Sequence, residues 1–81
     1  MTNEEIRTAF IEELIQIAPD IAPDDIDDED HLQEDLGLDS MDILNLVTAL
    51  HRRIGVDIPE EDYPKISKLR IAVTYIASKL T

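Results

Sequence analysis

The chain contains no cysteine among its 81 residues. A disulfide framework, a thiolate metal site and a cysteine nucleophile are therefore excluded, and any thiol that the protein uses must come from outside. Tryptophan is absent too, and aromatic residues make up 4% of the chain against 43% for hydrophobic residues. Aliphatic side chains must fill the core of a single small domain over residues 1–81, which is too short for a deep enzyme cleft.

Long apolar runs and basic residues are also scarce. No run approaches the ~18 apolar residues of a membrane span, and the N-terminus does not resemble a signal peptide. The formal net charge is −12, and residues 1–39 hold 14 of the 19 acidic residues but one basic residue. This charge disfavours nucleic acid and anionic membranes and favours partners with basic docking surfaces. We expect a cytoplasmic monomer that does not insert stably into membranes.

Apolar residues recur at helical spacing in three segments. The first predicted helix covers about residues 4–18 and ends at Pro19. The second begins beside Ser40 and ends at Gly55, and the last extends to residue 80 from a possible cap at Ser67. The predicted fold class is all-α: three main helices and one short helix in a bundle, with a long loop between the first two helices.

The two less regular segments lie on either side of the second helix. Pro59 and the acids after it indicate the short helix, which Pro64 leaves little room to continue. The loop extends to Asp39, beyond the length usual for an unstructured connection in a compact domain. Three apolar residues are expected to hold this loop on the core: Ile26, Leu32 and Leu36.

Ser40 stands where the polar loop turns into an apolar-periodic helix. Serine and aspartate are both preferred at helix starts, so ordinary capping is one explanation of Ser40. The position also suits a phosphate ester, because an anion there meets unpaired backbone N–H groups and the positive end of the helix dipole. Neither neighbour of Ser40 is a histidine or lysine that could act as its general base, so autonomous catalysis is not expected.

The sequence Asp-Leu-Gly-Leu-Asp-Ser-Met-Asp at residues 35–42, followed by Ile-Leu-Asn-Leu-Val, resembles the attachment motif of acyl carrier proteins. The similarity continues through residues 55–62, residues 65–67 and Tyr75-Ile76. It implies that Ser40 carries 4′-phosphopantetheine. The other residues of the implied attachment motif are Asp39, Met41 and Asp42.

The resemblance implies that a separate phosphopantetheinyl transferase takes the arm from coenzyme A, using Mg²⁺. Acyl groups would then be carried as thioesters to partner enzymes of fatty-acid, polyketide or specialised lipid biosynthesis. The thiol of the arm would supply the nucleophile that a chain without cysteine lacks, and the resemblance implies that the carrier itself catalyses nothing. The family also shelters its cargo between helices, and the candidate lining residues, which equally suit ordinary core, are Leu44, Val47, Ile54, Ile66, Leu69, Ala72 and Ile76.

The second helix departs from the family pattern. Fatty-acid carriers usually continue the motif helix with glutamates that dock on basic patches of enzymes, whereas here a neutral residue and then three basic residues follow. Cations at a helix C-terminus complement its dipole, but they also repel a basic patch on a partner. We expect a specialised carrier with dedicated partners, and the candidate docking residues are Asp39, Asp42, Asn45, His51, Arg52 and Arg53.

Two alternatives stay open at this point. An aminoacyl or peptidyl carrier would use the same arm, although Asp39 before the serine favours the acyl branch. The acidic run at residues 24–30 also suits a cation-binding or adaptor module. Counted from Asp25 as an EF-hand loop it fails, because its sixth position is Asp30 rather than glycine and its twelfth is Leu36 rather than glutamate, so no specific metal site is expected. Since the chain starts at Met1 and ends after the last apolar segment, a free-standing carrier is expected.

Overall fold

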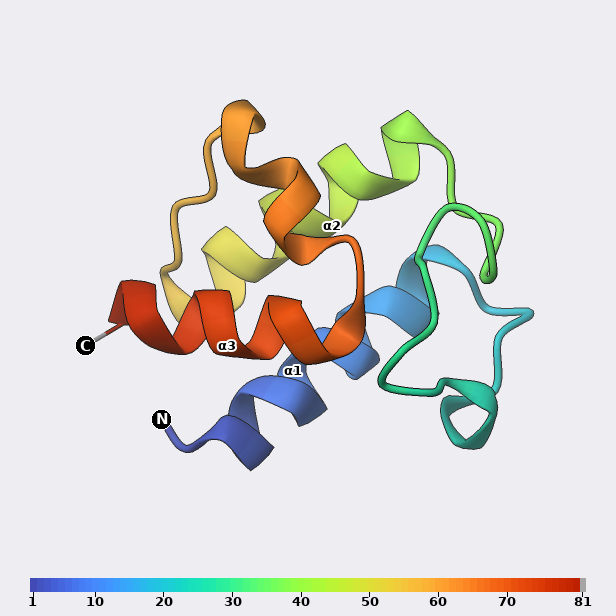
Figure 1. The fold of residues 1–81 in the computed structure, drawn as a ribbon, viewed down its shortest axis with the longest axis horizontal. Helices are drawn as coiled ribbons and strands as arrows, with labels where there is room; N and C mark the ends of the chain where they lie inside the picture. Colours follow the sequence, from blue (N-terminus) through green and yellow to red (C-terminus); the bar gives the residue numbers. More distant parts are fainter. Residues whose placement is uncertain (81) are drawn as a thin grey trace.

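The computed structural model describes residues 1–80, which form a small helical bundle (Figure 1). The elements follow one another as α1 (Asn3–Ile17), the 3₁₀ helix η1 (Pro23–Asp25), α2 (Ser40–Ile54), the 3₁₀ helix η2 (Glu60–Ile66) and α3 (Leu69–Leu80). The predicted all-α class is confirmed, with three main helices, a short helix between α2 and α3, and a long connection between α1 and α2.

The ends of α1 and α2 have the local chemistry that the sequence indicates. The Glu5 backbone N–H donates to Thr2 Oγ1 at 3.1 Å, and the Thr2 N–H donates to Glu5 Oε1 at 2.8 Å. This reciprocal capping box satisfies two donors at the start of α1. At the other helix, Gly55 ends α2 with φ 72°, a left-handed conformation that glycine adopts without strain.

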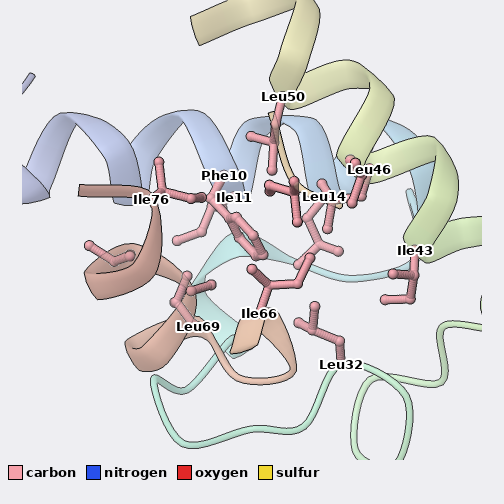
Figure 2. Packing of buried hydrophobic residues seen from close by; sticks show 14 of the residues in the cluster. Phe10, Ile11, Leu14, Leu32, Ile43, Leu46, Leu50, Ile66, Leu69 and Ile76 are labelled. Atoms are coloured by element: carbon pink, nitrogen blue, oxygen red, sulfur yellow. The ribbon is translucent and has the colours of Figure 1, made fainter. Parts of the chain in front are cut away.

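The core is built around α1, which lies against both α2 and α3, while η2 lies against α3. Figure 2 shows Phe10 and Leu14 of α1, Leu46 and Leu50 of α2, and Ile66 of η2 pointing into one shared interior. All five side chains are fully buried. Burial of such side chains contributes roughly 1.5 to 3 kcal/mol each, so this single cluster is the main source of stability.

The connection between α1 and α2 is held to the core by its apolar residues. Ile26 and Leu32 are buried as expected, and Leu36 is partly buried against the same cluster. Leu38, for which the sequence offered no interpretation, is also buried. Two backbone hydrogen bonds of 2.9 Å fix this segment: the Leu32 N–H donates to the Ser67 carbonyl, and the Leu38 N–H donates to the Leu32 carbonyl.

The short helix continues two residues past Pro64 to Ile66, because in a 3₁₀ turn the Pro64 carbonyl still accepts from the Ser67 N–H. One detail of the expected secondary structure is wrong. Ser67 does not cap α3: its backbone is already helical, whereas a cap residue is extended. The Ala72 N–H donates to the Lys68 carbonyl, which places the start of α3 one residue later.

The acidic run in the connection binds basic residues of two helices. Asp28 pairs with Arg7 of α1 at 2.9 Å, and Glu29 pairs with Arg70 of α3 and lies 3.9 Å from the Lys68 ammonium. The Arg70 N–H also donates to the Asp28 carbonyl at 3.0 Å. The side chains are exposed, so each pair stabilises the fold only slightly, but together they orient the connection.

We predict that Leu32→Ala lowers the unfolding free energy by about 2 to 5 kcal/mol, because it leaves a cavity where the connection meets the core. Leu44→Ala is the matched control, since the Leu44 side chain is 44% exposed. That control should cost less than about 1 kcal/mol. Urea unfolding followed by circular dichroism measures both, and equal losses would contradict the anchoring role of Leu32.

Candidate functional site

Two aspartates determine where α2 begins. The Asp42 N–H donates to Asp39 Oδ1 at 2.8 Å, and the Asp39 N–H donates to Asp42 Oδ2 at 3.2 Å. Asp39 has the extended backbone of a cap residue, so Ser40 is the first residue inside the helix. The interpretation of Ser40 as an ordinary cap is therefore wrong, because Asp39 performs that role.

The Ser40 side chain is exposed, and within residues 1–80 no hydrogen bond holds its hydroxyl. The backbone N–H groups of Ser40 and Met41 stand in the first turn, where a helix has no partner of its own for them. An anionic group on the serine oxygen would meet these donors and the positive end of the helix dipole. The chemistry of the position therefore fits a phosphate ester.

Ser40 also lines a cleft of about 560 Å³ between the connection, the start of α2 and η2. Buried Leu32, Ile43 and Ile66 contribute apolar surface to it, and Tyr63 and Pro64 of η2 form part of its wall. In Figure 2, Leu32, Ile43 and Ile66 come from these three different segments. A flexible arm anchored at Ser40 can fold into this cleft. Its polar lining residues are His31, Gln33, Glu34, Glu60 and Ser67.

The residues expected around an acyl chain are divided between cleft and core. Leu44 and Ile66 line the cleft beside Ser40. Four others are fully or nearly buried in the core, because they lie on the inward faces of their helices: Val47, Leu69, Ala72 and Ile76. Ile54 is partly buried at the opposite end of α2 from Ser40. Sequence analysis missed Ile43, although its position one turn after Ser40 in an apolar stripe was a usable signal.

The candidate docking residues are spread along the whole of α2. Asp39 and Asp42 lie beside Ser40, exposed Asn45 follows one turn later, and exposed His51 and Arg52 lie in the last turn. Arg53 differs from them, because its guanidinium binds Glu13 of α1 at 2.8 Å and also Glu12. The bonds to Glu13 and Glu12 raise the pKa of Arg53, and the residue joins α2 to α1.

One polar contact holds the η2 wall of the cleft on α3. The Tyr75 hydroxyl of α3 donates to Asp62 Oδ2 of η2 at 2.5 Å, and the Lys65 ammonium lies 3.3 Å from the same carboxylate. Burial, and then the Asp62 carboxylate, raise the pKa of Tyr75 to about 12. The hydrogen bond from Tyr75 lowers the pKa of Asp62. The contact therefore consists of a neutral phenol and an ionised carboxylate at neutral pH.

Comparisons with known proteins agree with this geometry. Residues 8–74 match the family described as phosphopantetheine attachment site. The chain is 37% identical to an acyl carrier protein of Campylobacter hominis over 73 residues, which cover 90% of this chain and 86% of that protein. It is 32% identical to an acyl carrier protein of Chloroherpeton thalassium over 79 residues, or 98% of each chain. An acyl carrier protein of Wolinella succinogenes is 33% identical over 90% of each chain.

A small all-α bundle with an exposed serine at a helix start thus coincides with a phosphopantetheine attachment domain. The chain belongs to the acyl carrier protein family, and it carries acyl groups on a covalently attached 4′-phosphopantetheine. Proteins of this family are carriers that work with biosynthetic enzymes. Among residues 1–80, no helix is long and apolar enough to cross a membrane.

We predict that Tyr75→Phe lowers the unfolding free energy by about 1 kcal/mol, because it removes a partly buried hydrogen bond to a carboxylate. The sign of the pH dependence follows from the raised pKa of Tyr75 in the folded state. Its contribution is complete below pH ~10, the pKa of an unperturbed tyrosine, and is lost as the pH rises to about 12.

Thermal unfolding of both proteins across that alkaline range measures the effect. The parent should lose stability more steeply than Tyr75→Phe between the two pKa values, so its advantage over the variant should shrink and then reverse as the buried phenol ionises. Parallel curves would contradict the assignment of the raised pKa to this contact.

Proposed function

We propose that Ser40 is the residue to which the phosphopantetheine is attached. The observation that carries the proposal is the Asp39–Asp42 capping box, which leaves the Ser40 hydroxyl exposed at the first residue of α2. Attachment there places the phosphate at the N–H groups of the first helical turn and directs the arm toward the cleft. Asp39, Met41 and Asp42 complete the attachment motif around it.

The loading reaction needs a base that this chain does not offer. The Ser40 oxygen would bond to the phosphorus of coenzyme A that bears the pantetheine, displacing the nucleotide portion and losing its proton. Within residues 1–80 no histidine, lysine or carboxylate is hydrogen-bonded to the Ser40 hydroxyl to take that proton. The phosphopantetheinyl transferase would therefore supply both the base and the Mg²⁺, and the carrier would have no catalytic activity of its own.

The charges on α2 support a specialised carrier with dedicated partners. Asp39 and Asp42 offer a negative surface beside Ser40 to enzymes with basic patches, as the resemblance implies. The rest of the exposed helix is neutral or basic, which disfavours docking on enzymes that bind uniformly acidic carriers. We further propose that the carrier is a monomer and that it meets its dedicated partner enzymes in the cytoplasm.

The acidic cation-binding module is less well supported than the carrier. Asp28 and Glu29 of the acidic run are engaged with Arg7, Lys68 and Arg70. Across residues 1–80, no group of three or more acidic or histidine side chains is placed to hold a metal ion. The three relatives are named acyl carrier proteins, so the acyl cargo is also favoured over an aminoacyl cargo.

We predict that the parent gains the mass of one phosphopantetheine when incubated with coenzyme A, Mg²⁺ and a broad-specificity phosphopantetheinyl transferase. Ser40→Ala should gain none, and neither should the parent when Mg²⁺ is removed by a chelator. Ser67→Ala is the matched control, because Ser67 lines the same cleft. Intact-mass spectrometry reads the result, and modification of Ser40→Ala would contradict the proposed attachment site.

We also predict poor use of the loaded chain by general fatty-acid enzymes. A housekeeping ketosynthase should show a kcat/KM at least about tenfold lower with this carrier than with its own carrier, because like charges oppose each other at the docking surface. Steady-state kinetics with identically acylated carriers measures the difference. Equal kcat/KM values would contradict the specialised role while leaving the attachment site untouched.

A further inference from the structure

The exposed face of α2, defined as Met41, Leu44, Asn45, Thr48, His51 and Arg52, starts beside Ser40 and follows the helix to its last turn. Its members recur at spacings of three and four residues, so they lie along one side of the helix. Met41 is 62% exposed and Leu44 is 44% exposed. Large apolar side chains exposed next to the attachment residue indicate a surface that a partner covers.

The charge changes along α2 from its start to its end. Asp39 and Asp42 lie at the end near Ser40, Asn45 and Thr48 are neutral, and Arg52 lies near the C-terminal end. Arg52 lies twelve positions after Ser40 in the helix, which is about 18 Å along the helix axis. A partner that contacts both ends therefore meets opposite charges at two places.

Arg52 differs from the other three arginines of the chain, which all form ion pairs with carboxylates. Arg7, Arg53 and Arg70 each bind at least one carboxylate, and so do Lys65 and Lys68. Arg52 forms no ion pair with any residue from 1 to 80, although the net charge of the chain is −12. Its neighbour Arg53 is already paired with Glu12 and Glu13.

We propose that the enzyme that uses this carrier presents carboxylates to Arg52, about 18 Å along α2 from the point where it receives the arm. This inference rests on Ser40 as the attachment residue. The partner surface thus has two parts: a basic region that meets Asp39 and Asp42, and an acidic region that meets Arg52. An enzyme with a uniformly basic patch fits the first part and is repelled by the second.

The test uses the loaded carrier and, as probe, a housekeeping malonyl transferase whose docking patch is basic. Arg52→Glu should raise kcat/KM for malonyl loading by about tenfold at low salt, and the gain should shrink as salt screens the charges. Lys79→Glu is the matched control: it changes the net charge equally, but Lys79 lies near the C-terminal end of α3. That variant should change kcat/KM by less than about twofold.

A reciprocal change in the probe tests the partner chemistry directly. Each basic residue of the transferase patch is replaced by glutamate in turn. The unmodified transferase should have a higher kcat/KM with the Arg52→Glu carrier than with the parent carrier. At least one transferase variant should show the reverse order. A double-mutant cycle then gives the coupling energy between Arg52 and that position of the transferase. A glutamate near the C-terminal end of α2 interacts unfavourably with the helix dipole and can destabilise the fold. Thermal unfolding of Arg52→Glu therefore checks that the variant is folded under the assay conditions.

Three outcomes would overturn the inference: no change with Arg52→Glu, an equal change with Lys79→Glu, or no reversal with any transferase variant. A parent chain that dimerises, with Arg52→Glu abolishing the dimer, would also overturn it by assigning Arg52 to a second copy. Failure of the attachment proposal is seen separately, because the mass of each carrier is measured before the kinetic assay.

Discussion

The reciprocal hydrogen bonds between Asp39 and Asp42 fix the residue at which α2 begins and therefore the place of Ser40 in it. They make Asp39 the cap and Ser40 the first helical residue, and each residue turns the helix by about 100°. From this start, Ile43, Leu46 and Leu50 face the core. The same geometry turns Ser40 toward the cleft and leaves the exposed face of α2 to solvent. A helix that began one residue later would use the Ser40 hydroxyl as its cap, and the hydroxyl would then be engaged in a backbone hydrogen bond.

Much of the fold follows from short-range patterns in the sequence. Apolar spacing is enough to identify α1, α2 and α3, and Gly55 is sufficient to place the end of α2. The choice between Asp39 and Ser40 as the cap was beyond sequence analysis, because both residue types are preferred at that position. The course of η2 through Pro64 was missed because its 3₁₀ hydrogen bonding depends on backbone geometry.

The candidate site was predicted less completely than the fold, since its walls come from distant parts of the chain. The motif was sufficient to propose Ser40, but helical periodicity identifies only which side of a helix is apolar. It does not show that Val47 is buried in the core or that Leu44 lines the cleft. Two of the residues that line the cleft, Leu32 in the connection and Ser67 after η2, are joined by a backbone hydrogen bond although they lie far apart in the sequence. The pairing of Arg53 with Glu13, 40 residues apart, is invisible to local patterns for the same reason.

Charge in this chain has two separate physical roles. The acidic excess repels nucleic acid and steers basic surfaces toward the carrier from a distance, an effect that depends on net charge rather than on single residues. Many acidic carriers share that property, so it cannot distinguish one partner from another. Discrimination requires a position where the sign is reversed and the charge is not neutralised within the carrier. Glu12 and Glu13 already bind the Arg53 guanidinium, whereas Arg52 forms no ion pair with any residue from 1 to 80, which is why we propose Arg52 for this role. The contact that we propose at Arg52 would make specificity in this carrier depend on a basic residue in a predominantly acidic chain.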